Sequence, residues 1–125
     1  MASILVVDDE DSIREVLTRR LRGWGHEVVA VGSAAEALTQ MEVSQAAIVF
    51  CDLIMPVHDG FWLLEQIRER WPEMILVVVS AAEELATVMK TRQYGPVDYV
   101  PKPVGREMLY QALQRALARL ESRRL

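Results

Sequence analysis

The sequence has little cysteine, little lysine and no long hydrophobic run. Its one cysteine, Cys51, excludes an intramolecular disulfide and a thiolate metal cluster, so a reducing compartment, the cytoplasm, is expected. The apolar runs, such as residues 74–79, are too short to span a membrane, and the first residues lack the basic region of an export signal. The net charge of -4 is too small for an acidic tail. An ordinary globular domain away from the membrane is therefore expected.

Short apolar runs alternate with segments of helical period along the whole chain. Because the runs are apolar throughout instead of alternating with polar residues, both faces of each strand are expected to be buried, as in a parallel sheet covered by helices. The pattern predicts five βα units in a three-layer, doubly wound α/β domain over residues 1–125, with residues 123–125 as a tail or the start of a linker. The predicted strands are residues 4–7, 28–31, 46–50, 74–79 and 97–100.

Capping signals place several helix ends. Ser33 followed by Glu36 is a capping-box pattern, and Asp59 is expected to begin the third helix. Gly23 is expected just past the end of the first helix. The fourth helix is different, because Ala81 and Ala82 offer no side-chain acceptor at its start. It is therefore expected to be easy to move.

Polar side chains follow four of the five predicted strands. Asp8 and Asp9 follow the first strand, Asp52 the third, Ser80 the fourth and Lys102 the fifth, whereas the second ends at Gly32 without a reactive group. Ligands of an open parallel sheet bind outside the carboxyl ends of its strands. These carboxylates, the hydroxyl and the ammonium are therefore expected to gather at one edge.

Crowded carboxylates need a compensating cation, and hard oxygen ligands with an open coordination shell suit Mg²⁺. A magnesium ion, a lysine and a hydroxyl around one carboxylate can hold the oxygens of a phosphoryl group while that carboxylate acts as nucleophile. Asp52 is the predicted nucleophile because it is a single acid at a central strand end, whereas Asp8 and Asp9 are paired as metal ligands often are. The sequence thus favours aspartyl phosphorylation.

Taken together, four motifs resemble the receiver domain of two-component response regulators over essentially the whole chain. They are Val-Val-Asp-Asp-Glu at 6–10, Asp-Leu-Ile-Met-Pro-x-x-Asp-Gly at 52–60, Val-Ser-Ala at 79–81 and Asp-Tyr-Val-x-Lys-Pro at 98–103. The resemblance implies a flavodoxin-like fold with strand order 2-1-3-4-5. It also implies functional roles: phosphoacceptor for Asp52, magnesium ligands for Asp8 (through water), Asp9, Asp52 and the backbone carbonyl of Ile54, phosphoryl contact for Lys102, and switch residues for Ser80 and Tyr99.

The resemblance further implies partners and an output. The phosphoryl donor would be a phosphohistidine of a sensor histidine kinase or a histidine phosphotransfer protein, and the output surface would comprise the fourth helix, the fifth strand and the fifth helix. A downstream effector and a phosphorylation-dependent dimer follow from this, but no direct contact with nucleic acid. The protein would not be a conventional enzyme. Slow autodephosphorylation is expected because Ile54 and Ala82, which lie two residues past Asp52 and Ser80, cannot position a water by hydrogen bonding.

Three other functions are compatible with an α/β domain of this kind. A flavodoxin-like cofactor binder would need a phosphate-binding first turn, which Asp8, Asp9 and Glu10 would repel. A hydrolase acting through an aspartyl phosphate would need a second acid near Asp52, and Ile54 stands at that position. A receiver-like interaction module that is never phosphorylated stays open as the alternative.

The basic residues are distributed unevenly. Lys90 and Lys102 are the only lysines, so arginine supplies nearly all the positive charge. Arginines cluster in the first and last helical segments, which are expected to share one face of the sheet. This clustering indicates either a basic docking flank for an acidic partner or simply solvated helix faces. The arginines concerned are Arg14, Arg19, Arg20, Arg22, Arg106, Arg115, Arg119, Arg123 and Arg124.

Overall fold

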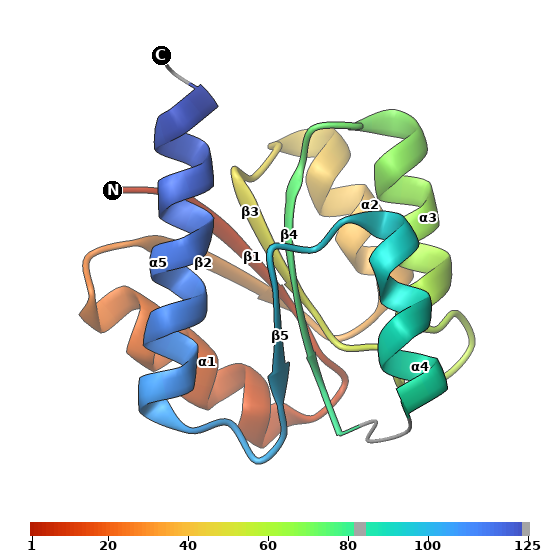
Figure 1. Ribbon diagram of the computed structural model, residues 1–125, viewed down its shortest axis with the longest axis horizontal. Helices are drawn as coiled ribbons and strands as arrows, with labels where there is room; N and C mark the ends of the chain where they lie inside the picture. Colours follow the sequence, from red (N-terminus) through yellow and green to blue (C-terminus); the bar gives the residue numbers. More distant parts are fainter. Residues whose placement is uncertain (82–84, 124–125) are drawn as a thin grey trace.

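The protein is an open five-stranded parallel sheet with helices on both faces (Figure 1). The computed structural model describes residues 1–81 and 85–123. The strand order β2-β1-β3-β4-β5 confirms the predicted flavodoxin-like topology. The strands are β1 (Ser3–Val7), β2 (Glu27–Val31), β3 (Ile48–Cys51), β4 (Ile75–Ser80) and β5 (Asp98–Pro101).

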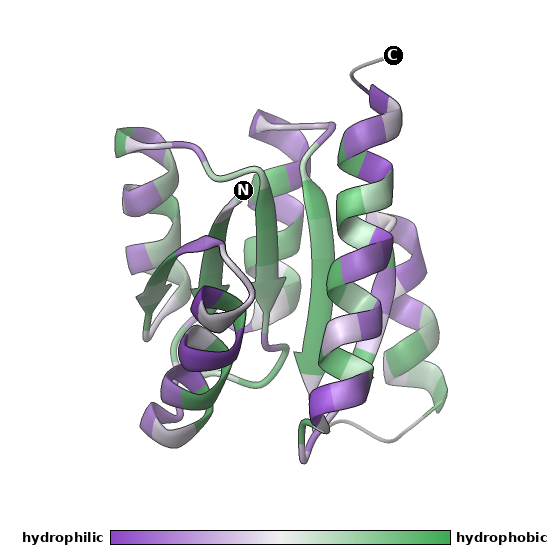
Figure 2. Ribbon diagram, turned by 90° about the vertical axis from the view of Figure 1, so that its left-hand side faces the viewer, coloured by the Kyte–Doolittle hydropathy of each residue, from purple (hydrophilic) through white to green (hydrophobic). Residues whose placement is uncertain are grey.

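The helices form the two outer layers. Helices α1 and α5 bury Leu17, Leu21, Leu109 and Leu113 against one face of the sheet, and α2 and α3 cover the other face. The strands β1, β3 and β4 are hydrophobic and almost entirely buried, as expected for a sheet covered by helices, while the helices mix hydrophobic and hydrophilic residues (Figure 2). The prediction that every strand is buried on both faces is wrong for β2, which lies at the edge of the sheet and leaves Val29 and Ala30 exposed. The helices are α1 (Asp11–Gly23), α2 (Ala34–Val43), α3 (Gly60–Arg70), α4 (Leu85–Lys90), which continues into the 3-10 helix η1 (Thr91–Tyr94), and α5 (Arg106–Arg123).

Two of the predicted capping signals are confirmed and one is wrong. Ser33 accepts a hydrogen bond from the backbone N–H of Glu36, and Asp59 accepts one from Trp62. Gly23, by contrast, is the last residue of α1 instead of the residue beyond it. The left-handed conformation belongs to Gly25, with a φ of 96°, because the chain makes one more turn at Trp24 before it enters β2.

Helix α4 makes the weakest contribution to the core. None of its residues is buried, and the side chain of Leu85 is 75% exposed. Ala82, which was predicted to leave the helix start uncapped, lies outside the described residues. Arg124 and Leu125 of the predicted tail also lie outside them, while Arg123 is the last residue of α5. No helix in the described ranges is long and apolar enough to cross a membrane.

The strand boundaries differ slightly from the predicted ones. Strand β3 begins at Ile48 instead of residue 46, and its Ile48 to Cys51 pair with Ile4 to Val7 of β1. Ala46 and Ala47 instead belong to the connection from α2, although Ala46 is still buried. Apolar character alone does not separate a buried loop residue from a strand residue, which explains the difference.

Candidate functional site

The predicted site residues meet at the carboxyl edge of the sheet. Asp8 follows β1, Asp52 follows β3, Ser80 ends β4 and Lys102 follows β5. Asp8, Asp52 and Ser80 are each at most 2% exposed. Such burial is unusual for the two carboxylates. The strand order explains the meeting, because β1, β3, β4 and β5 are consecutive neighbours in the sheet.

Lys102 lies among three carboxylates. Its Nζ is 2.8 Å from Oδ2 of Asp8, 3.0 Å from Oε1 of Glu10 and 3.2 Å from Oδ2 of Asp52. Burial alone would lower the pKa of Lys102, but the hydrogen bonds to Asp8 and Glu10 outweigh it and the pKa rises. Lys102 therefore carries a positive charge at the centre of the site.

The two carboxylate oxygens of Asp52 have different partners. Its Oδ1 accepts a hydrogen bond of 3.2 Å from the backbone N–H of Ile54, and its Oδ2 faces Lys102. Burial raises the pKa of Asp52, and the nearby Asp8 carboxylate raises it further, while Ile54 and Lys102 oppose the rise. The site thus keeps a desolvated carboxylate beside a cation, which favours a nucleophilic role.

The acidic residues have the geometry of a divalent cation site. Carboxylate oxygens of Asp8, Asp9, Glu10 and Asp52 lie within 4.8 Å of one another. Two of these residues are buried and two are exposed, which leaves one side of the cluster open to water and further ligands. Such an oxygen-only donor set with an open side fits Mg²⁺.

Glu10 was not among the predicted site residues. In the structure its carboxylate reaches Lys102 and belongs to the same acidic cluster as Asp8 and Asp9. The sequence contains a weak signal for this, since Glu10 directly follows the two aspartates. A position three residues beyond the end of β1 does not by itself show which way the side chain points.

Ser80 and Tyr99 lie side by side next to Asp52. Burial raises the pKa of Tyr99, a hydrogen bond with the Ser80 side chain opposes this rise, and the Asp52 charge adds to it. The ring of Tyr99 packs against the core between the sheet and helices α2 and α3. The predicted switch residues are therefore already in contact with each other in this conformation.

Ile54 has two separate relations to the site. Its backbone N–H holds Asp52, while its side chain is 60% exposed beyond the acidic cluster. The prediction of slow autodephosphorylation rests on this apolar side chain, which cannot hydrogen-bond a water, and stays a prediction. The partner residue in that prediction, Ala82, lies outside the described residues.

Gly60 fixes the backbone beneath the phosphoacceptor candidate. A Cβ atom at Gly60 would lie 2.0 Å from the carbonyl oxygen of Asp52 and 2.5 Å from the Cα of Leu53. The Gly60 N–H also donates to the carbonyl of Leu53 at 2.9 Å. The first turn of α3 can pack this closely on the end of β3 only because residue 60 has no side chain.

Several arginines of the predicted basic flank bind the protein's own backbone. Helices α1 and α5 do share one face of the sheet. Arg20 donates to the carbonyl of Val104 at 3.0 Å, and Arg22 donates to that of Val28 at 2.9 Å. Arg115 pairs with Asp98. These arginines thus contribute to the fold, while Arg19, Arg106 and Arg119 lie exposed on the same helices.

Comparison with known proteins gives a consistent result. The sequence profile of the response regulator receiver domain matches residues 4–114. The DNA-binding transcriptional regulator NtrC of Azospirillum brasilense is 35% identical over 93% of this chain, and the match covers 24% of that protein. This chain therefore spans about a quarter of that relative's length.

Solved structures agree with the sequence matches. NtrX from Brucella abortus, crystallised with ADP, has a TM-score of 0.92 and 31% identity over 99% of this chain and 29% of its own. The chemotaxis protein CheY4 of Vibrio cholerae has a TM-score of 0.87 and 26% identity over 93% of this chain and 98% of its own. The likeness to CheY4 covers nearly the whole of both chains.

Proposed function

Since the chain belongs to the family of response regulator receiver domains, we propose that it is a phosphorylation-activated signalling switch whose phosphoacceptor is Asp52. The observation that carries the proposal is the position of Lys102, whose Nζ is 3.2 Å from Oδ2 of Asp52 and 2.8 Å from Asp8. A buried carboxylate beside a fixed ammonium suits attack on phosphorus, because the ammonium can stabilise the charge of the phosphoryl oxygens.

The proposed reaction is transfer from a phosphohistidine of a sensor histidine kinase or a histidine phosphotransfer protein. A bond forms between an Asp52 oxygen and phosphorus, and the phosphorus–nitrogen bond of the donor breaks, with its electron pair returning to the imidazole. Oδ2 is the candidate attacking oxygen, since Oδ1 is held by the Ile54 N–H. Lys102 stays protonated throughout, because the carboxylates around it raise its pKa.

Asp8, Asp9 and Asp52, together with the backbone carbonyl of Ile54, are the proposed ligands of Mg²⁺, with Asp8 acting through water. Glu10 is a further candidate from the acidic cluster. A bound magnesium ion would supply charge neutralisation for the phosphoryl oxygens. The burial of Asp8 and Asp52 supports this assignment, because buried carboxylates need more positive charge than one lysine supplies.

Ser80 and Tyr99 are the proposed switch residues. Ser80 is fully buried beside the site, and a phosphoryl group on Asp52 would offer its hydroxyl a charged acceptor. Because Tyr99 contacts Ser80, movement of the hydroxyl changes the surroundings of the ring. The change would then reach the surface of α4, β5 and α5, where α4 has no buried residue to hold it in place.

The proposed output is control of a downstream effector protein or domain in the cytoplasm, through a surface that could also form a phosphorylation-dependent dimer. The curated relative from Azospirillum is named a DNA-binding transcriptional regulator. We propose no direct contact of this chain with nucleic acid, because its active edge is acidic. Nor do we propose a conventional enzyme, beyond assistance to its own phosphorylation and slow dephosphorylation.

The test is phosphorylation by a small-molecule donor. The protein is incubated with acetyl phosphate and Mg²⁺, and its intact mass is measured. We expect one added phosphoryl group on the wild type and none on Asp52→Asn. Asp59→Asn is the matched control, because Asp59 caps α3 and asparagine caps a helix equally well, so this variant should be labelled like the wild type.

The competing function is a receiver-like interaction module that works without phosphorylation. Absence of label on both the wild type and Asp59→Asn, with acetyl phosphate and with a histidine kinase, would favour that function. Equal labelling of Asp52→Asn and the wild type would instead show that another residue accepts the phosphoryl group.

A further inference from the structure

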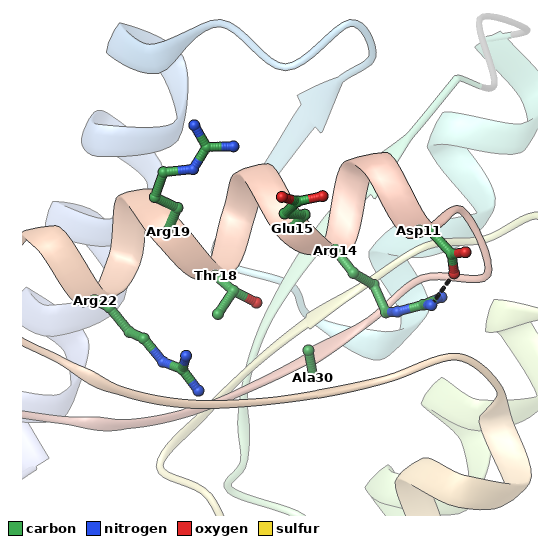
Figure 3. A pocket seen from close by; sticks show the side chains of 7 residues that line it. All are labelled: Asp11, Arg14, Glu15, Thr18, Arg19, Arg22 and Ala30. Atoms are coloured by element: carbon green, nitrogen blue, oxygen red, sulfur yellow. Dashed lines mark hydrogen bonds and ion pairs between the residues drawn. The ribbon is translucent and has the colours of Figure 1, made fainter.

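The loop that carries Asp8 and Asp9 is bound by the side chain of Arg14 of α1. The Nη1 of Arg14 donates a hydrogen bond of 2.7 Å to the backbone carbonyl of Asp8, and its Nη2 pairs with Asp11. Figure 3 shows the Arg14 side chain extending from α1 toward this loop, with its guanidinium beside Asp11. The guanidinium therefore bridges the loop and the first turn of the helix.

Every other polar group of Asp8 also has a partner. Its N–H donates to the carbonyl of Val31 at 3.2 Å, its Oδ1 accepts from the N–H of Glu10 at 2.9 Å, and its Oδ2 faces Lys102. The bond from Arg14 fixes the last free group, the carbonyl. This carbonyl belongs to the peptide unit that joins Asp8 to Asp9, so its orientation sets the direction in which the Asp9 side chain leaves the loop.

Gly32 makes room for this arrangement. A Cβ atom at residue 32 would lie 3.1 Å from Nη1 of Arg14, the nitrogen that binds the Asp8 carbonyl. No backbone strain requires a glycine at this position, since its φ is not in the left-handed region. The Arg14 guanidinium therefore packs against Gly32, and a Cβ atom at residue 32 would shift the guanidinium by a few tenths of an ångström, which lengthens its bond to the Asp8 carbonyl.

We propose that Arg14, seated against Gly32, is a positioning residue for magnesium binding: it orients the Asp8–Asp9 peptide so that the Asp9 carboxylate faces the cation site. The inference rests on the proposed magnesium site. It concerns a residue that does not touch the cation or the phosphoryl group and acts through the backbone of its ligands. Partners of this kind in other metal sites change metal affinity by ~10-fold or more.

The direction in which Mg²⁺ affinity changes when Arg14 is replaced distinguishes a positioning role from a purely electrostatic one. Arg14 is a cation close to the acidic cluster, so its charge alone weakens Mg²⁺ binding, and removing that charge would tighten binding. If Arg14 instead positions the ligands, its removal must weaken binding despite the loss of repulsion. The two explanations thus predict opposite changes.

The experiment measures Mg²⁺ affinity by following backbone amide chemical shifts during a Mg²⁺ titration of the full chain. We expect Arg14→Met to bind Mg²⁺ ~10-fold more weakly than the wild type. Gly32→Ala should also weaken binding, although it keeps the charge of Arg14. The matched control is Arg22→Met, because Arg22 also lies on α1 and binds a strand carbonyl, that of Val28, away from the site. It should bind Mg²⁺ like the wild type.

Each variant is also unfolded by heat in the presence of a chelator, so that a loss of affinity is read on folded protein. If Arg14→Met unfolds at the titration temperature, the Gly32→Ala result alone decides. Wild-type or tighter affinity in both Arg14→Met and Gly32→Ala would overturn the inference while leaving the magnesium site intact. Failure of the wild type itself to bind Mg²⁺ would overturn the proposed site and this inference together.

Discussion

Lys102 and Asp52 are 50 residues apart in the sequence, yet the Nζ of one lies 3.2 Å from the Oδ2 of the other. They follow β5 and β3, which are separated in the sheet only by β4. Two more carboxylates, those of Asp8 and Glu10, contact the same ammonium. The charge balance of the site therefore depends on Lys102. We expect the stability of the protein to change when either Lys102 or Asp52 is replaced.

Replacement of Lys102 should destabilise the protein. Lys102→Met leaves the buried Asp8 and Asp52 carboxylates without their cation, so we expect the free energy of unfolding to fall by about 3 kcal/mol at pH 7. Chemical denaturation in a chelator measures this, and added Mg²⁺ should restore part of the loss. The control is Lys90→Met: the contact that the described residues give the Lys90 ammonium is a cation–π contact with Phe61, so this variant should cost less than about 1 kcal/mol. Equal losses in the two variants would contradict the prediction.

Removal of the Asp52 charge should have the opposite effect on stability. Burial raises the pKa of Asp52 in the folded protein above its value in the unfolded chain. The folded protein is therefore more stable when Asp52 is protonated, and this stability is lost as the pH rises through the pKa of the folded protein. Asp52→Asn should therefore raise the melting temperature at pH 7 by ~3 °C in a chelator, and the gain should shrink as the pH falls toward 4. A melting temperature below that of the wild type at pH 7 would show that the contact with Lys102 outweighs the burial.

A side chain at residue 60 should displace the backbone of Asp52 and destabilise the protein. In Gly60→Ala the new Cβ would collide with the backbone of Asp52, which cannot move aside as a flexible side chain could. We expect a loss of ~3 kcal/mol in the free energy of unfolding, together with weaker phosphorylation of the protein that still folds. Gly23→Ala has open space around its Cβ and lies in a helix, so it should not lower stability.

Helix α4 should open more readily than α1. Helix α1 buries Leu17 and Leu21, whereas no side chain of Leu85–Lys90 is buried. Amide hydrogen exchange should therefore be faster in α4 by on the order of 100-fold. Phosphorylation should alter exchange in α4 more than in α1. Equally slow exchange in both helices, before and after phosphorylation, would remove α4 from the proposed switch.

Stability should also fall in mild acid because of His26. The N–H of Ala2 donates to Nδ1 of His26 at 3.0 Å, and burial, followed by the charge of the N-terminus, lowers the pKa of His26 below its usual 6.5. A lowered pKa means that the unfolded chain takes up the proton first, so this contribution is lost as the pH falls below about 6.5. His26→Gln should reduce the stability difference between pH 7.5 and 5.5, measured by denaturation.

The sequence predicts the sheet edge well because the strand signal is physical and local. Fully apolar runs such as residues 4–7 are buried on both sides, and the first polar residue after each run marks the strand end. The strand order, which was predicted from the family resemblance and not from the local pattern, brings Asp8, Asp52, Ser80 and Lys102 together. Chemistry at this edge is therefore accessible from the sequence alone.

Other parts of the site depend on contacts between elements, which no local pattern contains. The packing of Arg14 on Gly32 joins α1 to the end of β2, and the approach of Gly60 to Asp52 joins α3 to the end of β3. The residues next to Gly32 and Gly60 in the sequence give no sign of these contacts. Val57 adopts a left-handed φ of 68°, which is rare for a β-branched residue, and nothing in the structure explains it.

The scarcity of lysine gives this protein an unusual response to acylating reagents. Apart from the N-terminal amine, acylation can reach only Lys90 on α4 and Lys102, whose side chain is 8% exposed. Acylation of Lys102 removes the ammonium on which three carboxylates depend. Because Lys102 is nearly buried and its raised pKa keeps it protonated, it should react far more slowly than the exposed Lys90. Acylation of Lys102 would therefore report opening of the proposed site.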